Sequence, residues 1–82
     1  MQDIIEYRIT EIIKSVIPVY TSEELLSSTS FEDSGIVFDS VEIILIVIEL
    51  EREFDIRFSD EDIILGFNSI IGIKDIISRY IS

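Results

Sequence analysis

Cysteine and histidine are both absent from this chain of 82 residues. Without cysteine the chain has no disulfide, no thiolate metal ligand and no catalytic thiol. Without histidine it lacks the usual general base, the usual zinc ligand and every catalytic triad that contains histidine. We therefore expect no catalytic residue, no metal site and no enzyme that works with its own side chains.

Basic residues are scarce: six Lys and Arg stand against 17 Asp and Glu, a net charge of −11. Such a surface repels nucleic acid and anionic membranes and suits a partner with a basic patch. The longest uncharged apolar run, residues 43–48, is far shorter than the ~20 residues of a membrane-spanning helix. The acidic start, MQDIIEYRIT, is unlike a signal peptide. We predict a cytoplasmic monomer without nucleic-acid ligands or membrane insertion.

Residues 3–17 repeat apolar side chains at the three- and four-residue spacing of a helix with one buried face. Pro18 ends this first predicted helix. The stretch from there to Phe38 is rich in serine and threonine, with a turn at Gly35 and a candidate helical turn at Ser22. It also holds apolar anchors, so we predict an ordered loop. The first helix places on its apolar face Ile4, Ile5, Ile9, Ile12, Ile13, Val16 and Ile17; the loop anchors are Leu25, Leu26, Phe31, Ile36 and Phe38.

Residues 40–55 are rich in strand-favouring valine and isoleucine, yet two features favour a helix. The segment continues into ELEREFD, a strong helix former, and Asp39 stands where a carboxylate caps a first turn. Ser59 as N-cap with Asp62 at the capping-box position predicts a short helix near 60–65, ended by Gly66. Residues 70–82 form a last helix with a stripe of Ile73, Ile76, Ile77 and Tyr80. The predicted fold class is all-α: one domain, residues 1–82, built as a four-helix bundle with a long loop between helices 1 and 2 and a short third helix.

The helix from residue 40 has two apolar faces when its residues are placed at ~100° intervals. One arc is a core face, a second is an acidic stripe, and a third is a further apolar face that is either more core or an exposed ridge for docking. The core arc holds Ile43, Ile46, Val47, Leu50 and Phe54; the stripe holds Glu42, Glu49 and Glu53; the third arc holds Val41, Ile44, Leu45 and Ile48, with Glu51 and Arg52 beside it.

Ser40 begins this helix and has two possible roles besides that of an ordinary helix-start residue. As a nucleophile it has no histidine to take its proton, and Lys14 and Lys74 are the only lysines. A helix N-terminus does attract phosphate, so the serine is suited to carrying a phosphodiester that presents another reactive group.

Asp39-Ser40 with its following apolar residue, the upstream FEDSG and the segment VEIILIVIELEREFDIRFSDED resemble a stand-alone acyl carrier protein. The resemblance is strongest over residues 31–62 and implies the family's acyl-carrier type of four-helix bundle. It further implies that a phosphopantetheinyl transferase, using coenzyme A and magnesium, attaches 4′-phosphopantetheine to Ser40. The thiol of that arm then holds an acyl or aminoacyl group as a thioester, and the chemistry belongs to the arm and to partner enzymes.

By position, the resemblance makes Asp39 the motif neighbour of Ser40 and places partner contacts along the second helix of the family. Loading and processing enzymes with basic patches are the expected partners. The partner-binding residues that we predict are Val41, Glu42, Ile44, Leu45, Ile48, Glu49, Glu51 and Arg52.

Leu45 replaces an acid often found in such carriers, and Ser34 stands where leucine is common. These departures favour a specialised carrier in polyketide, nonribosomal peptide or envelope-related synthesis over fatty acid synthesis. A second hypothesis is an acidic adaptor that binds a helical partner through the ridge with Ser40 unmodified. A third, a metal binder that uses SDED and Asp55, lacks the spacing of a calcium loop.

Overall fold

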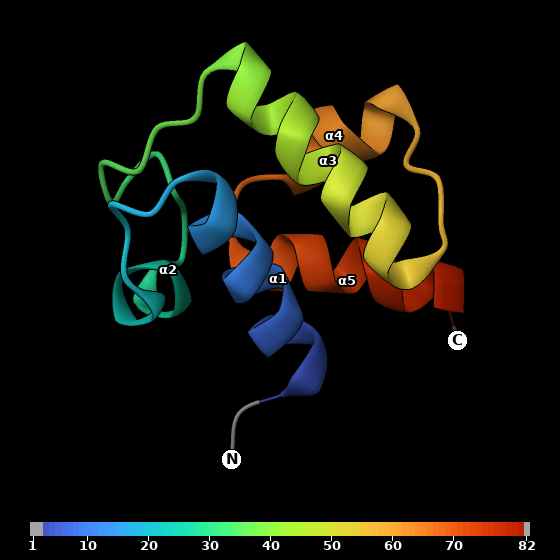
Figure 1. Cartoon of the computed structure of the whole chain (residues 1–82), viewed down its shortest axis with the longest axis horizontal. Helices are drawn as coiled ribbons and strands as arrows, with labels where there is room; N and C mark the ends of the chain where they lie inside the picture. The colour runs from blue at the N-terminus through green and yellow to red at the C-terminus, as the bar shows by residue number, and fades with distance from the viewer. Residues whose placement is uncertain (1–2, 82) are drawn as a thin grey trace.

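The computed structural model describes residues 3–81, and all regular structure in that range is helical (Figure 1). In chain order the helices of this range are α1 (Ile4–Val16), α2 (Ser22–Ser27), α3 (Ser40–Phe54), α4 (Asp60–Gly66) and α5 (Ile70–Ile81). Helices α1, α3, α4 and α5 are those of the predicted bundle, and α2 lies inside the long first connection. The all-α fold and its long loop are confirmed. Positions 1, 2 and 82 of the predicted domain lie outside the described residues.

Local side-chain caps decide where the helices begin. Asp3 accepts the N–H groups of the first turn of α1, at 2.8 and 3.2 Å. Ser59 and Asp62 form a reciprocal capping box at α4, as predicted from the sequence. Thr21 and Glu24 form a second box at α2, which was not predicted. Each box satisfies two backbone N–H groups that a helix N-terminus leaves free, so these starts follow from short sequence patterns.

The core lies where α1 meets α2, α3 and α5. Figure 1 shows α3 passing in front of α4 and of the end of α5, with α1 next to it and α2 at the side of the molecule. Two predicted stripe residues are not buried: Ile4 is 71% exposed and Tyr80 is 46% exposed. Ile4 belongs to the first turn of α1, which extends past α5 in Figure 1 and has no helix to cover it. The buried apolar side chains are Ile9, Ile13, Ile17, Leu25, Phe31, Ile36, Ile46, Leu50, Phe58, Ile70, Ile73, Ile76 and Ile77.

The connection between α2 and α3 is ordered by buried anchors, as predicted. Phe31 and Ile36 are buried, and the Phe31 N–H donates to the Asn68 carbonyl at 2.7 Å. The Ile36 N–H donates back to the Phe31 carbonyl at 2.8 Å, which closes a turn around Gly35. Gly35 has φ +77°, a left-handed conformation that glycine adopts without strain. The connection is thereby led to the N-terminal end of α3.

Within residues 3–81, we find no helix with both the length and the apolar character needed to cross a membrane.

The C-terminal end of α3 is held by an ion pair. Arg8 and Glu53, 2.6 Å apart, join α1 to the last turn of α3. Beyond α3 the chain turns at Asp55, which has φ 54°. Aspartate tolerates this left-handed conformation better than most side chains do.

Candidate functional site

Asp39 and Ser40 form the start of α3. Asp39 is extended, with φ −81° and ψ 174°, and its carboxylate accepts the Glu42 N–H at 2.8 Å. The Glu42 carboxylate accepts the Asp39 N–H at 2.9 Å, which completes a capping box and confirms the predicted helix start. Ser40 is the first helical residue and is exposed. It therefore lies in solvent at the positive end of the helix dipole, where a phosphate is stabilised.

Neither lysine of the chain is available as a base for Ser40. Lys74 is paired with Asp3 at 3.2 Å and with Glu6 at 3.1 Å, and its hydrogen bonds to these acids raise its pKa above the usual value. Lys14 lies against Glu11 at 3.3 Å and donates to a serine hydroxyl of α2 at 2.8 Å. Because the chain also has no histidine, it offers Ser40 neither a histidine nor an unpaired lysine as a base.

The second apolar face of α3 is exposed. We call the set Val41, Ile44, Leu45 and Ile48 the ridge; these side chains are 64%, 56%, 46% and 42% exposed. The core face of the same helix contrasts with it, since Ile46 is 1% exposed and Leu50 is fully buried. The exposed alternative left open by the sequence is the correct one. Ile43, Val47 and Phe54 of the predicted core arc are partly buried.

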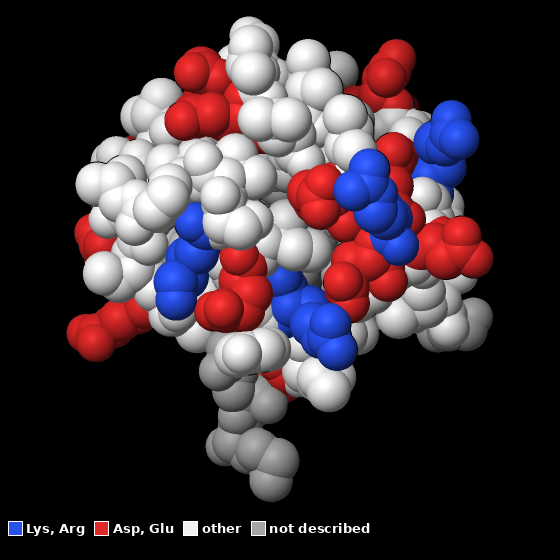
Figure 2. Space-filling view, viewed as in Figure 1, with Lys and Arg blue, Asp and Glu red and all other residues white. Residues whose placement is uncertain are grey.

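Charged side chains of both signs are gathered at the C-terminal half of α3, while its N-terminal half is largely uncharged apart from acidic side chains at its start (Figure 2). Glu49 pairs with Arg52 at 3.2 Å on the surface. Glu51 instead turns towards the segment after the helix, where its carboxylate accepts the Phe58 N–H at 2.8 Å. Glu51 therefore has a structural contact in addition to the partner contact predicted for it.

A hollow of about 300 Å³ opens beside the first turn of α3. Most of its walls are apolar, with Glu32 and Asn68 among the polar residues that line it. Because Ile43 of α3 is one of the walls, the hollow lies within one helical turn of Ser40. Its lining suits an apolar group held near that serine. The apolar walls are Phe31, Ile36, Val37, Phe38, Ile43 and Phe67.

Two residues at this site were missed or incompletely described by sequence reasoning. Glu42 was predicted as part of the acidic stripe and as a partner contact but not as a cap, although its spacing from Asp39 is that of a capping box and predicts the contact. Tyr20 was not singled out at all. Its hydroxyl contacts Val37, 17 residues further along the chain, and no local pattern signals a contact of that range.

No group of three or more acidic side chains in the described part of the chain is arranged to hold a metal ion. Asp62 of the SDED segment is engaged elsewhere: it accepts the Tyr80 hydroxyl at 2.5 Å and the Ser59 N–H at 3.1 Å. The hydrogen bond from Tyr80, followed by that from Ser59, lowers the pKa of the Asp62 carboxyl. Nothing in this geometry favours the metal-binding hypothesis.

Comparison with known proteins identifies the family of this chain. A family model described as a phosphopantetheine attachment site matches residues 8–77, which include all of α3 and the Asp39-Ser40 pair. The acyl carrier protein of Buchnera aphidicola subsp. Schizaphis graminum (strain Sg) is 36% identical over 58 residues, 71% of this chain and 71% of that protein. The chain therefore belongs to the phosphopantetheine-binding carrier family, related to acyl carrier proteins, whose members are not enzymes themselves and work through a phosphopantetheine cofactor.

Proposed function

We propose that Ser40 carries the 4′-phosphopantetheine arm and that the protein holds acyl or aminoacyl groups as thioesters on it. The observation that carries this proposal is the exposed Ser40 hydroxyl at a capped helix start, beside an exposed apolar ridge. The family match supports the cofactor, and the geometry supports this serine as its attachment point. Asp39 holds the first turn through its capping box.

Attachment is a phosphoryl transfer from coenzyme A. The Ser40 hydroxyl oxygen attacks the phosphorus that bears the pantetheine and forms a phosphodiester. The bond between that phosphorus and the bridging oxygen of the pyrophosphate breaks, and adenosine 3′,5′-bisphosphate leaves with the bridging oxygen. The serine proton passes to a base of the phosphopantetheinyl transferase, since both lysines of this chain are already paired with acids. The free thiol at the end of the arm then accepts the acyl or aminoacyl group.

The ridge and its charged neighbours are the proposed contact surface for the transferase and for loading and processing enzymes. Apolar side chains supply contact area, and the acids of α3 favour partners with basic patches. Leu45 extends the apolar part of this surface. The departures seen in the sequence lead us to propose that the carrier works in a specialised pathway, namely polyketide, nonribosomal peptide or envelope-related synthesis.

Incubation with coenzyme A, magnesium and a broad-specificity transferase tests the assignment. Intact mass should show one added phosphopantetheinyl group on the wild type and none on Ser40→Ala. Ser22→Ala is the matched control, because Ser22 is also the first residue of a helix; it should still be modified. An arm on Ser40→Ala would remove Ser40 from the proposal.

A small acidic adaptor is the second candidate, favoured by the exposed ridge alone. In that case a helical partner lies on Val41, Ile44, Leu45 and Ile48, and Ser40 stays unmodified. Absence of modification by several different transferases would favour the adaptor over the carrier.

We further propose that residues 1–82 act as one monomeric carrier domain in the cytoplasm, where coenzyme A is available. The described helices share one core, and the net charge of −11 disfavours association with a second copy. Sedimentation equilibrium at low and moderate salt tests the oligomeric state, and a stable dimer would contradict it.

A further inference from the structure

The segment that leads into Ser40 has one position, Val37, whose side chain does not anchor it to the core. Residues 36–39 are irregular, and within them Ile36 is buried while Val37 is 71% exposed. The backbone of Ile36 is fixed by the Phe31 carbonyl, and that of Asp39 by the Glu42 carboxylate. Val37 lies between these two fixed points and needs a contact from elsewhere to have a defined position.

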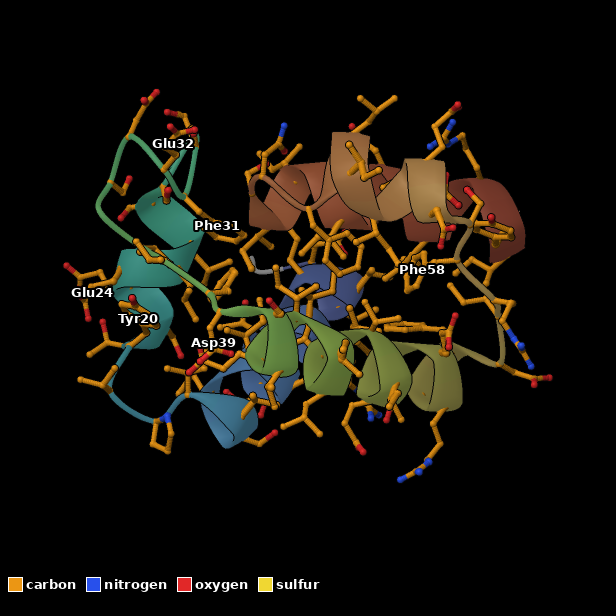
Figure 3. All side chains as sticks on the ribbon, turned by 90° about the horizontal axis from the view of Figure 1, so that it is seen from above. Tyr20, Glu24, Phe31, Glu32, Asp39 and Phe58 are labelled. Carbon is orange, nitrogen blue, oxygen red and sulfur yellow. The ribbon has the colours of Figure 1, made fainter. Side chains whose placement is uncertain are left out.

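That contact comes from Tyr20, in the turn between α1 and α2. The Tyr20 hydroxyl accepts the Val37 N–H at 3.1 Å and lies 3.4 Å from the Val37 carbonyl, to which it donates. The Tyr20 ring meets the Phe38 ring edge to face, with centroids 6.3 Å apart, and Phe38 meets Phe31 in the same way at 5.2 Å. Figure 3 shows Tyr20, Phe31 and Asp39 at the same end of the molecule, far from Phe58.

We infer that Tyr20 is a positioning residue for Ser40. Its hydroxyl holds both polar backbone groups of Val37, so that the cap at Asp39 and the serine after it keep one arrangement relative to the rest of the bundle. Val37 and Phe38 also line the hollow beside α3, so the same contact keeps that wall in place. This inference rests on the proposed attachment of the arm to Ser40.

The expected consequence is a change in how well the carrier binds the transferase. If the transferase binds only one arrangement of the segment, its apparent dissociation constant for the carrier equals the intrinsic constant divided by the fraction of molecules in that arrangement. Tyr20→Phe keeps the ring contacts and removes both hydrogen bonds to Val37. Water replaces those bonds at this exposed position, so the helices should stay folded.

Two measurements on Tyr20→Phe test the inference. The transferase KM for the carrier should rise about three- to tenfold with kcat unchanged, as expected if the competent arrangement falls to between about a third and a tenth of molecules. Amide hydrogen exchange should accelerate at Val37 and stay unchanged in α5. Tyr7→Phe, an exposed tyrosine of α1 far from this segment in sequence, is the matched control and should change neither quantity.

The outcomes separate this inference from the proposed function. A modified wild type with an unchanged KM and unchanged Val37 exchange in Tyr20→Phe would overturn the role of Tyr20 alone. A KM that returns to the wild-type value on cooling, together with faster exchange in α5, would mean general unfolding and would also overturn it. A wild type that takes no arm, or takes it on a residue other than Ser40, would overturn both.

Discussion

Truncating α3 on its two apolar faces should give opposite results. Ile46 is 1% exposed in the centre of the core, whereas Ile44 is 56% exposed two residues earlier. Both changes, Ile46→Ala and Ile44→Ala, remove the same atoms from the same helix. The pair therefore isolates burial as the variable.

The expected magnitudes follow from that burial. Ile46→Ala leaves a cavity among buried neighbours and should cost about 2–5 kcal/mol. Ile44→Ala loses less than half of the ~1.5–3 kcal/mol for a fully buried isoleucine and leaves no closed cavity. Alanine also regains a few tenths of a kcal/mol through its better helix propensity, ~0.4 kcal/mol on the usual scales. The net cost of Ile44→Ala should be about 0–1 kcal/mol.

Urea unfolding followed by circular dichroism at the helix band measures the unfolding free energy of both variants. In a thermal melt of a domain of this size about 1 kcal/mol corresponds to 4–8 °C in Tm, and the two variants should differ by at least about 1 kcal/mol, so Ile46→Ala should melt at least about 4 °C below Ile44→Ala. Ile48→Ala should resemble Ile44→Ala, and both should slow modification by the transferase. If Ile44→Ala melts as early as Ile46→Ala, the ridge is packed in solution and is no docking surface.

Three other predictions concern the charge and the packing of the fold. Raising ionic strength from very low to ~0.15 M shortens the screening length to about 8 Å, so the urea midpoint should rise; a fixed midpoint would show that self-repulsion from the net charge of −11 is negligible. The hydrogen bond between Tyr80 and Asp62 lowers the pKa of the Asp62 carboxyl below its ordinary 3.8 and raises the pKa of the Tyr80 hydroxyl above its ordinary 10.0. The stabilisation from this contact is therefore fully present between pH 3.8 and 10.0, and it is lost as the pH falls through the lowered pKa of Asp62 or rises through the raised pKa of Tyr80. The difference in unfolding free energy between wild type and Tyr80→Phe should therefore shrink below pH 3.8 and above pH 10.0, and one independent of pH would refute the contact. Gly72→Ala places a Cβ 2.6 Å from the Gly66 carbonyl oxygen and should destabilise the α4–α5 packing by roughly 1–3 kcal/mol; an unchanged Tm would show that the two helices separate readily.

The sequence predicts the helices well because their determinants are local. Asp39 and Ser59 cap helices through side chains only three residues from their partners, so a short pattern contains the whole contact. Periodicity also separates the two apolar arcs of α3, but it left open whether the second arc is core or exposed, and only the packed structure shows that it is exposed.

Contacts between distant segments could not be predicted in the same way. Glu51 reads as a surface acid, but the turn at Asp55 brings the Phe58 N–H to its carboxylate. Tyr20 reaches Val37 only because Phe31 and Ile36 first fix the loop against the core. Both contacts form only in the assembled bundle, and no spacing in the sequence predicts them.

The area of the ridge bears on how a carrier of this kind would leave its partners. The exposed parts of its four side chains together equal about two whole side chains. Burying them would contribute about 3–6 kcal/mol, at ~1.5–3 kcal/mol for each fully buried side chain. Association itself costs an estimated 4–15 kcal/mol, so apolar contact alone does not hold a complex together. Under the proposed function, the remainder would come from charge complementarity along α3 and from the arm and its cargo inside the partner's active site. A ridge of this size therefore favours brief complexes, whose formation is accelerated by the acidic surface and whose lifetime depends on what the arm carries.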